Sequence, residues 1–212
     1  YLHAGDEFSG TPWFSVYKGL ADAAVLNRLR FDAFVPGNHE FDQGPAVLGT
    51  FLDSLRAPAV AANLDASEEP ALRGKIRPAI VRDFGRRKVA IVGVAQPETP
   101  VISSPGPHVK FRSAFSVQRT IDSVRNEGAS VVILLSHAGL DVDTVIARKL
   151  SGVSCIVGGH SHTRMGTEFT QVGLPTKVPY PVVVRTKDGA SVPVVQSWEW
   201  GKEIGQIDLE FD

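Results

Sequence analysis

The sequence of 212 residues has little of several features that would mark a specialised class of protein. It has one cysteine, so no internal disulfide can form, and we interpret Cys155, in the apolar run VSCIVGG, as a buried core thiol. Lys and Arg total 22 against 23 Asp and Glu, without a basic run, so the charge gives no indication of nucleic-acid binding. No apolar run reaches the roughly 18 residues of a membrane span.

The sequence also lacks an initial methionine and a visible signal segment. It begins YLHAGD, which reads as the second half of a strand, so we expect it to start inside a longer protein. Hydrophobic content of 43% and charged content of 21% are typical of a globular protein. Without a repeat, a low-complexity tract or a strong linker, residues 1–212 are predicted to form one domain.

Short apolar runs rich in Val and Ile alternate with helix-periodic segments, which is typical of an α/β protein. Strands are predicted at Ala33–Pro36, Ala59–Ala62, Lys88–Ala95, Ser130–Ser136 and Ser154–Val157. Helices are predicted at Trp13–Arg30, Pro45–Leu55, Ala114–Asn126 and Asp143–Leu150. After His162 the pattern predicts an antiparallel β segment with strands at Pro181–Thr186, Ser191–Ser197 and Gly205–Phe211.

Polar side chains follow four of these apolar runs. LHAG leads into Asp6, AFVP into Asn38 and His39, VVILLS into His137, and CIVGG into His160 and His162. Ligands of α/β folds bind at the carboxyl ends of the strands, so we expect these side chains to meet at one edge. Imidazole and carboxylate groups without thiolate suit zinc, manganese or iron(II). A bridging Asp6 with a His-x-His pair could hold two metals about 3.5–4 Å apart, the usual arrangement for displacement at phosphorus.

The neighbours of Asn38 indicate acid–base chemistry. With Asn38 directed at the metals, His39 can donate to a phosphate or a departing ester oxygen, and Asp42 is placed to fix its tautomer. Glu40 is interpreted as a salt-bridge partner, and Asn63 as either a substrate contact or a turn cap. His3 and His108 are interpreted as non-functional histidines. Trp13, Trp198 and Trp200 are interpreted as core or rim aromatics.

The motifs GDxxxG at 5–10, GNHEFD at 37–42, LSH at 135–137 and GGHSH at 158–162 together give a specific pattern. In their order, and in segments such as VPVVQSWEWGKEIGQIDLEFD, the chain resembles metallophosphoesterases of the 5′-nucleotidase family, particularly ecto-5′-nucleotidase and its bacterial relatives. The resemblance implies a four-layer α/β/β/α sandwich of the calcineurin-like type with two divalent metal ions, commonly zinc or manganese.

The resemblance also assigns the site residues. Asp6 bridges the two metals, Asn38, His137 and His160 complete one site, His162 belongs to the other, and His39 with Asp42 matches the catalytic dyad. The family's opening Asp-x-His strand and its C-terminal substrate-binding domain have no counterpart in residues 1–212. We therefore expect an incomplete catalytic domain that hydrolyses nucleotides poorly by itself.

The expected reaction is hydrolysis of a nucleoside 5′-monophosphate to nucleoside and phosphate by a metal-activated water. Alternatives are a UDP-sugar, a nucleoside di- or triphosphate or a 2′,3′-cyclic nucleotide as substrate, with sulfur esters disfavoured. A degenerate module that binds metal and nucleotide without turnover is a different class. The family implies a periplasmic or extracellular location, and a homodimer stays open.

Overall fold

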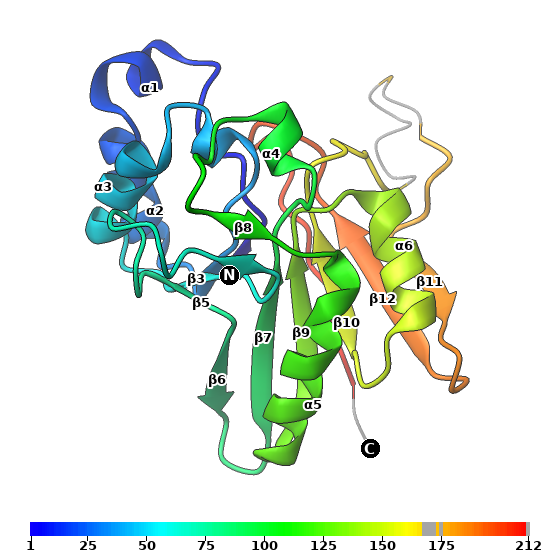
Figure 1. Cartoon of the computed structure of the whole chain (residues 1–212). Coiled ribbons are helices and arrows are strands. Elements are labelled where there is room, and N and C mark those ends of the chain that lie inside the picture. The colour runs from blue at the N-terminus through cyan, green and yellow to red at the C-terminus, as the bar shows by residue number, and fades with distance from the viewer. Residues whose placement is uncertain (167–172, 174–175, 211–212) are drawn as a thin grey trace.

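The computed structural model describes residues 1–166, 173 and 176–210, in which two β-sheets carry helices on their outer faces (Figure 1). The first sheet is parallel and has the order β1-β2-β3-β5, with β1 (Leu2–His3), β2 (Ala33–Phe34), β3 (Ala59–Val60) and β5 (Ile76–Arg77). The second has the order β11-β12-β10-β9-β7-β6. Its strands are β6 (Ala79–Asp83), β7 (Lys88–Val94), β9 (Ala129–Ser136), β10 (Cys155–Gly158), β11 (Val182–Arg185) and β12 (Ser191–Gln196).

The remaining elements connect and cover these sheets. A two-stranded ribbon joins β4 (Leu64–Asp65) to β8 (Lys110–Phe111). The α-helices are α1 (Pro12–Tyr17), α2 (Leu20–Leu29), α3 (Pro45–Ser54), α4 (Thr99–Ile102), α5 (Gln118–Asn126) and α6 (Leu140–Lys149). Two 3-10 turns are η1 (His39–Phe41) and η2 (Ala114–Val117). In Figure 1, α1–α3 lie beside the first sheet and α5 and α6 lie over the second.

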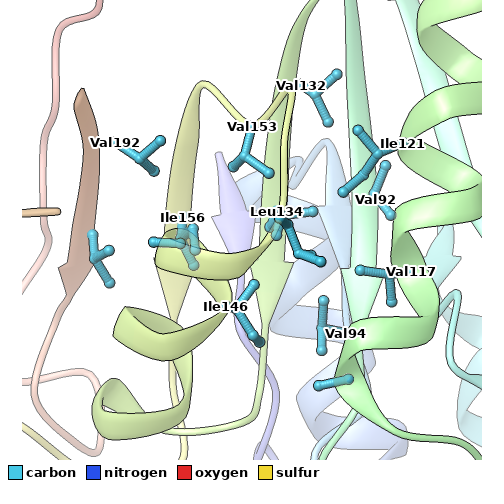
Figure 2. Close-up of a cluster of buried hydrophobic side chains, with 14 of the residues drawn as sticks. Val92, Val94, Val117, Ile121, Val132, Leu134, Ile146, Val153, Ile156 and Val192 are labelled. Carbon is cyan, nitrogen blue, oxygen red and sulfur yellow. The ribbon is translucent and has the colours of Figure 1, made fainter. Parts of the chain in front are cut away.

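Three clusters of buried side chains separate the layers. One lies between the two sheets and includes Val35, Val60 and Leu135. A second packs α2 and α3 onto the first sheet, and the third packs α5 and α6 onto the second (Figure 2). Because each sheet is covered on both faces, its central strands are apolar throughout, as in the run VVILL of β9. The predicted four-layer α/β/β/α fold is confirmed.

The predicted helix over Trp13–Arg30 is wrong, because the structure divides it into α1 and α2. Lys18 has φ 51° and Gly19 has φ 88°, so both residues are left-handed and end the first helix. The amphipathic spacing continues across the break, which explains why periodicity alone joined the two helices.

The C-terminal segment differs from its prediction in two ways. β11 and β12 are antiparallel as expected, but β12 also runs parallel to β10 and therefore extends the second sheet. Residues 205–210 form no strand, and Phe211 lies outside the described residues. A strand pattern forms a strand only where it pairs with a neighbour, and residues 205–210 pair with none, so the prediction for Gly205–Phe211 is wrong over its described part.

Cys155 lies in β10 and is buried, as predicted. Burial raises the pKa of its thiol to about 12, so the thiol stays protonated and unreactive at neutral pH. Among the described residues, no helix combines the length and the apolar character needed to cross a membrane.

Candidate metal centre

The carboxyl ends of β1, β2, β9 and β10 lead into the polar residues that the sequence singled out. Ligating atoms of Asp6, His137 and His160 all lie within 4.8 Å of one another. The rings of His137 and His160 meet edge to face, with centroids 5.2 Å apart. Both sheets contribute to this cluster, because Asp6 follows the first sheet's β1 while the two histidines follow β9 and β10 of the second. The clustered donors suit a divalent cation.

Three predicted ligand atoms are buried without a hydrogen-bond partner. They are Oδ1 of Asn38, Nε2 of His137 and Nδ1 of His160. Buried polar atoms are normally paired, so unpaired ones need an explanation. His137 Nε2 lies only 2.9 Å from Asp6 Oδ2, yet it makes no hydrogen bond of acceptable geometry. A cation held by the clustered atoms of Asp6, His137 and His160 would satisfy both unpaired nitrogens, so these residues fit a metal ion.

The backbone around the cluster approaches the clustered side chains closely, and it is strained at two residues. Asp6 has φ 58° and His160 has φ 71°, in the left-handed region that non-glycine residues seldom adopt. A Cβ atom on Gly37 would lie 2.2 Å from Asp6 Oδ1 and 2.7 Å from His137 Nε2. The loop before Asn38 can approach these ligands only because residue 37 is glycine. Strain of this kind concentrates at functional sites.

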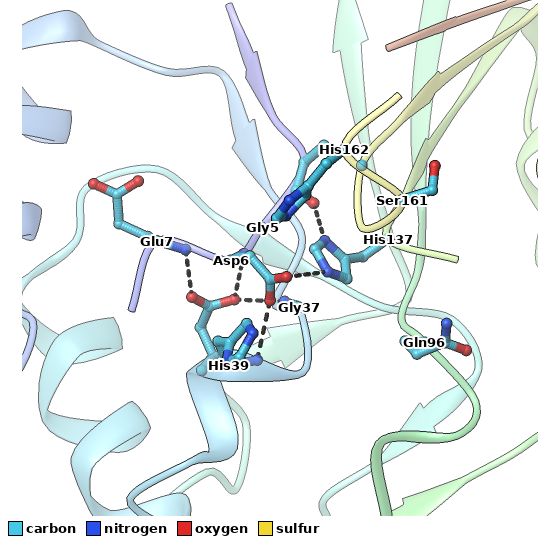
Figure 3. Close-up of polar contacts among 12 residues, drawn as sticks. Gly5, Asp6, Glu7, Gly37, His39, Gln96, His137, Ser161 and His162 are labelled. Atoms are coloured by element: carbon cyan, nitrogen blue, oxygen red, sulfur yellow. Dashed lines mark hydrogen bonds and ion pairs between the residues drawn. The ribbon is translucent and has the colours of Figure 1, made fainter. Parts of the chain in front are cut away.

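Asp6 and His137 form the electrostatic centre of the cluster. Burial opposes ionisation of Asp6, but the imidazole of His137, whose Nε2 lies 2.9 Å from Asp6 Oδ2, and the His39 backbone N–H, at 3.0 Å, lower its pKa. Burial likewise opposes protonation of His137, and the Asp6 carboxylate outweighs it and raises the pKa. The Nδ1–H of His137 donates to the carbonyl oxygen of Ala4, so Nε2 faces Asp6 (Figure 3). An imidazole fixed in this way is a typical metal ligand.

Glu40 is fully buried, and its role differs from the predicted salt bridge. Its carboxylate accepts four backbone N–H groups. Oε2 accepts from Asp6 at 2.9 Å and from Gly37 at 2.5 Å, and Oε1 accepts from Glu7 at 2.7 Å and from Phe8 at 3.1 Å. These bonds tie the loop after β1 to the loop after β2. Glu40 thereby holds the backbone of Asp6 in place, and Figure 3 shows dashed contacts from the labelled Asp6, Glu7 and Gly37 to the same carboxylate.

His39 lies outside the cluster of ligand atoms and pairs with Asp42. Its Nδ1 is 2.6 Å from Asp42 Oδ2, and its side chain is 46% exposed, so Nε2 can reach a bound molecule. Burial would lower the pKa of His39, but the hydrogen bond with Asp42 and the charges of Asp6, Asp42 and Glu40 raise it. Ser9 and Ser103 donate their hydroxyl groups to the two oxygens of Asp42, at 2.9 and 2.8 Å, and hold it in position.

His162 does not belong to the cluster of Asp6, His137 and His160, whose ligating atoms lie within 4.8 Å of one another. In the view of Figure 3 its ring lies beside Gly5 and Asp6, on the side opposite His39. Its side chain is 43% exposed, and Nδ1 lies 3.2 Å from Oε2 of Glu199. Sequence reasoning did not single out Glu199, because a carboxylate 37 positions further along the chain carries no motif.

A second residue that the sequence did not reveal is Gln196, at the end of β12. Its Oε1 accepts the Thr163 N–H and the Ser161 hydroxyl, and its Nε2 donates to the Gly159 carbonyl oxygen at 2.8 Å. The buried amide therefore fixes the loop that carries His160 and His162. Its position next to β10 arises from the parallel pairing of β12 and β10, which local sequence does not reveal.

The other candidates have structural surroundings. Asn63 is buried, donates to the carbonyl oxygens of Ala95 and Arg112, and accepts the Ala95 N–H, so its side chain joins distant backbone segments and has a structural role. His3 pairs with Glu7 at 2.8 Å. Trp13 and Trp200 are exposed and belong to the surface.

Comparisons with known proteins show the family of the chain. The model of the calcineurin-like phosphoesterase family matches residues 1–164. The 5′-nucleotidase of Diplobatis ommata is 39% identical over 215 residues, which are 100% of this chain and 37% of that protein. The chain thus spans less than two fifths of the length of that relative.

Two solved structures are similar over nearly the whole chain. The 5′-nucleotidase precursor of Thermus thermophilus has 46% identity and a TM-score of 0.91, covering 95% of this chain and 40% of that one. The NAD nucleotidase of Haemophilus influenzae has 36% identity and a TM-score of 0.89, covering 93% and 40%.

The two sheets, the cluster of Asp6, His137 and His160 at their shared edge and the match to the family model define a metallophosphoesterase domain. The chain belongs to the calcineurin-like phosphoesterase family, and within it the chain is a homologue of 5′-nucleotidases.

Proposed function

We propose that this chain is the metal-binding catalytic domain of a hydrolase that converts nucleoside 5′-monophosphates to nucleoside and phosphate. The observation that carries the proposal is the cluster of Asp6, His137 and His160, in which both histidines have an unpaired buried nitrogen. The unpaired buried Oδ1 of Asn38 adds to it. The similarity to 5′-nucleotidases supports the nucleotide as substrate. The greater length of these relatives supports a further, substrate-binding domain in the full-length protein.

The proposed cofactor is a pair of divalent cations, zinc or manganese. Asp6, Asn38, His137 and His160 would hold one cation, and Asp6 with His162 would contribute to the second. Bound cations supply a water of lowered pKa and positive charge for the phosphoryl oxygens. The chain's part is to orient the ligands: the Ala4 carbonyl oxygen fixes His137, and Glu40 fixes the backbone of Asp6.

The proposed general acid is His39. With Nδ1 held by Asp42, its Nε2 is the atom that faces a bound molecule and can deliver a proton to the departing ester oxygen. Proton transfer of this kind contributes about 10²–10⁴-fold to a rate. Because Asp42 is itself held by Ser9 and Ser103, the imidazole is oriented before substrate binds. We place the protein in the periplasm or outside the cell, following the family resemblance.

The test is release of phosphate by the full-length protein after metal removal and reloading with Mn²⁺ or Zn²⁺. We expect AMP to be the best substrate in a panel that also holds ADP, ATP, UDP-glucose, a 2′,3′-cyclic nucleotide and NAD. The last compound is included because of the similarity to an NAD nucleotidase. Faster turnover of another compound would replace the substrate assignment while leaving the phosphoesterase chemistry in place.

Two further outcomes bear on the alternatives. If the protein binds metal and nucleotide but releases no phosphate from any compound, it is a binding module. Residues 1–212 alone are expected to hydrolyse AMP poorly, since substrate contacts are proposed to lie in the further domain. Rapid AMP hydrolysis by residues 1–212 alone would contradict this division.

A further inference from the structure

The segment after β12 returns to the metal centre and contacts His162. Oε2 of Glu199 lies 3.2 Å from Nδ1 of His162, and Glu199 Oε1 accepts a hydrogen bond from Lys202 Nζ at 2.9 Å. The Glu199 side chain is only 16% exposed although it belongs to an irregular segment. A long carboxylate side chain that is largely shielded and paired at both oxygens has lost much of its freedom, which indicates a defined position.

The surroundings of Glu199 keep it in that position. Lys202 Nζ lies 4.3 Å from the ring centroid of Trp198 and 4.0 Å from that of Trp200. Arg164 adds a cation–π contact to Trp198 at 5.2 Å and an ion pair to Glu203 at 3.1 Å. The backbone is left-handed at both tryptophans, with φ 50° and 56°. Such strained backbone persists only where the surrounding contacts hold it, and it is frequent beside functional sites.

Three histidines at this edge share one arrangement. Nδ1 of each faces an oxygen of the protein: the Ala4 carbonyl oxygen for His137, Asp42 Oδ2 for His39 and Glu199 Oε2 for His162. A proton placed on Nδ1 leaves Nε2 as the free lone pair, and a carboxylate partner also increases the basicity of that nitrogen. His160 is different, because its Nδ1 is the buried unpaired atom. Glu199 thus takes a position beside His162 comparable to that of Asp42 beside His39, although the Glu199 contact is an ion pair at 3.2 Å and the Asp42 contact is a hydrogen bond at 2.6 Å.

We propose that Glu199 is a positioning residue that fixes the tautomer and direction of His162, so that its Nε2 is presented to the second cation. The inference rests on the proposed ligand role of His162. Lys202 helps to position Glu199, because it donates a hydrogen bond to the other carboxylate oxygen and also contacts the rings of Trp198 and Trp200. Loss of a partner that orients a metal ligand typically weakens metal affinity 10–100-fold.

The test compares Glu199→Ala, Glu199→Asp, Lys202→Met and His162→Ala in the full-length protein. Affinity and stoichiometry are measured with Mn²⁺ and Zn²⁺ by calorimetry and elemental analysis. The relevant cation is the one whose binding His162→Ala abolishes. We expect Glu199→Ala to weaken the affinity for that cation about 10–100-fold and to leave the affinity for the other cation unchanged. Glu199→Asp should recover part of the loss, and Lys202→Met, which keeps the carboxylate, should have the smallest effect.

A second measurement does not depend on metal. Long-range ¹⁵N NMR of the metal-free protein reports which nitrogen of His162 carries the proton. The wild-type protein should show the Nδ1–H form, and Glu199→Ala should show a mixture dominated by Nε2–H, as in a free imidazole. A fold control is the unchanged spectrum of His39, whose partner is Asp42.

The results separate the two proposals. If Glu199→Ala leaves both the cation affinity and the His162 tautomer as in the wild type while His162→Ala loses a cation, the role of Glu199 is overturned and the ligand assignment stands. If His162→Ala loses no cation, the ligand role of His162 fails together with this inference. The phosphoesterase reaction itself is tested separately, by the substrate panel.

Discussion

Nδ1 of His39 lies 2.6 Å from Oδ2 of Asp42, three residues further along the same 3-10 turn. Neither side chain belongs to the group of clustered ligand atoms, although the backbone N–H of His39 donates to the Asp6 carboxylate. The turn therefore places an oriented imidazole next to the cluster of Asp6, His137 and His160 but outside it. This relationship separates the proposed proton donor from the proposed metal ligands.

His39→Ala should leave metal content near the wild-type value and lower kcat about 10²–10⁴-fold, because only the proton donor is removed. His160→Ala should lose metal, since His160 Nδ1 is one of the unpaired buried atoms at the cluster. Elemental analysis of the purified variants and rates of phosphate release distinguish the two. Loss of a metal ion from His39→Ala would show that His39 is a ligand and that the division of roles is wrong.

Glu40→Gln should destabilise the protein and weaken metal binding. The amide offers one acceptor oxygen where the carboxylate has two, so two of the four backbone N–H groups lose their partner. Each buried unpaired N–H costs about 1–3 kcal/mol. Urea unfolding and Mn²⁺ titration measure the two effects. Glu68→Gln removes an exposed ion pair with Lys110 and is the matched control, with little change expected. Equal stability of both variants would contradict the role given to Glu40.

Asp143→Asn should change the pH dependence of stability. The buried Asp143 carboxyl accepts from the Ser136 hydroxyl, its Oδ2 has no partner, and burial raises its pKa to about 7. Because this pKa is above the unfolded value near 3.9, the stability it provides is full below about pH 4 and is lost progressively as the pH rises from there through 7. The side chain of Asn in the Asp143→Asn variant is neutral at every pH, so the variant does not lose stability in this way as the pH rises.

The free energy of unfolding of Asp143→Asn relative to wild type should therefore rise between pH 5 and pH 8, by an amount on the order of a few kcal/mol. Urea denaturation at the two pH values measures it. Asp122→Asn, which changes an exposed residue of α5, serves as the control. A difference that stays constant with pH would show that the Asp143 pKa is not raised.

Gly93→Ala should destabilise the contact between the two sheets. A Cβ atom at Gly93 in β7 would lie 2.1 Å from the Val60 carbonyl oxygen and 2.6 Å from the Ala61 nitrogen, both on the opposite sheet. Overpacking of this kind costs about 1–3 kcal/mol and sometimes more. Thermal unfolding is the measurement, with the exposed Ser130→Ala in β9 as control. An unchanged Tm would show that the sheets can separate there without cost.

The sequence indicated the fold well where local signals are strong. β7, β9 and β10 begin and end within one residue of their predictions, because apolar runs bounded by polar residues specify buried strands. It missed the break at Lys18 because the apolar period continues across it. It also missed β6, whose partner β7 follows it in a hairpin, since its exposed residues dilute the apolar pattern.

For the candidate site, the sequence by itself determined which residues stand at the ends of the strands. Asp6, Asn38, His137 and His160 each follow an apolar run, and strand direction alone brings such residues to one edge of the structure. The local sequence was therefore enough to predict that Asp6, His137 and His160 come together. The pairing of His39 with Asp42 was also accessible, because it spans a single turn.

Only the tertiary structure decided what holds these residues in place. Glu40 reaches the loop after β1, Gln196 reaches the loop after β10, and Glu199 reaches His162, across separations of 32 to 37 positions. No local pattern encodes such contacts, because they arise from how the two sheets and the final segment pack together. The strands determine which candidate ligands reach the shared edge, whereas the packed fold determines how their side chains are oriented.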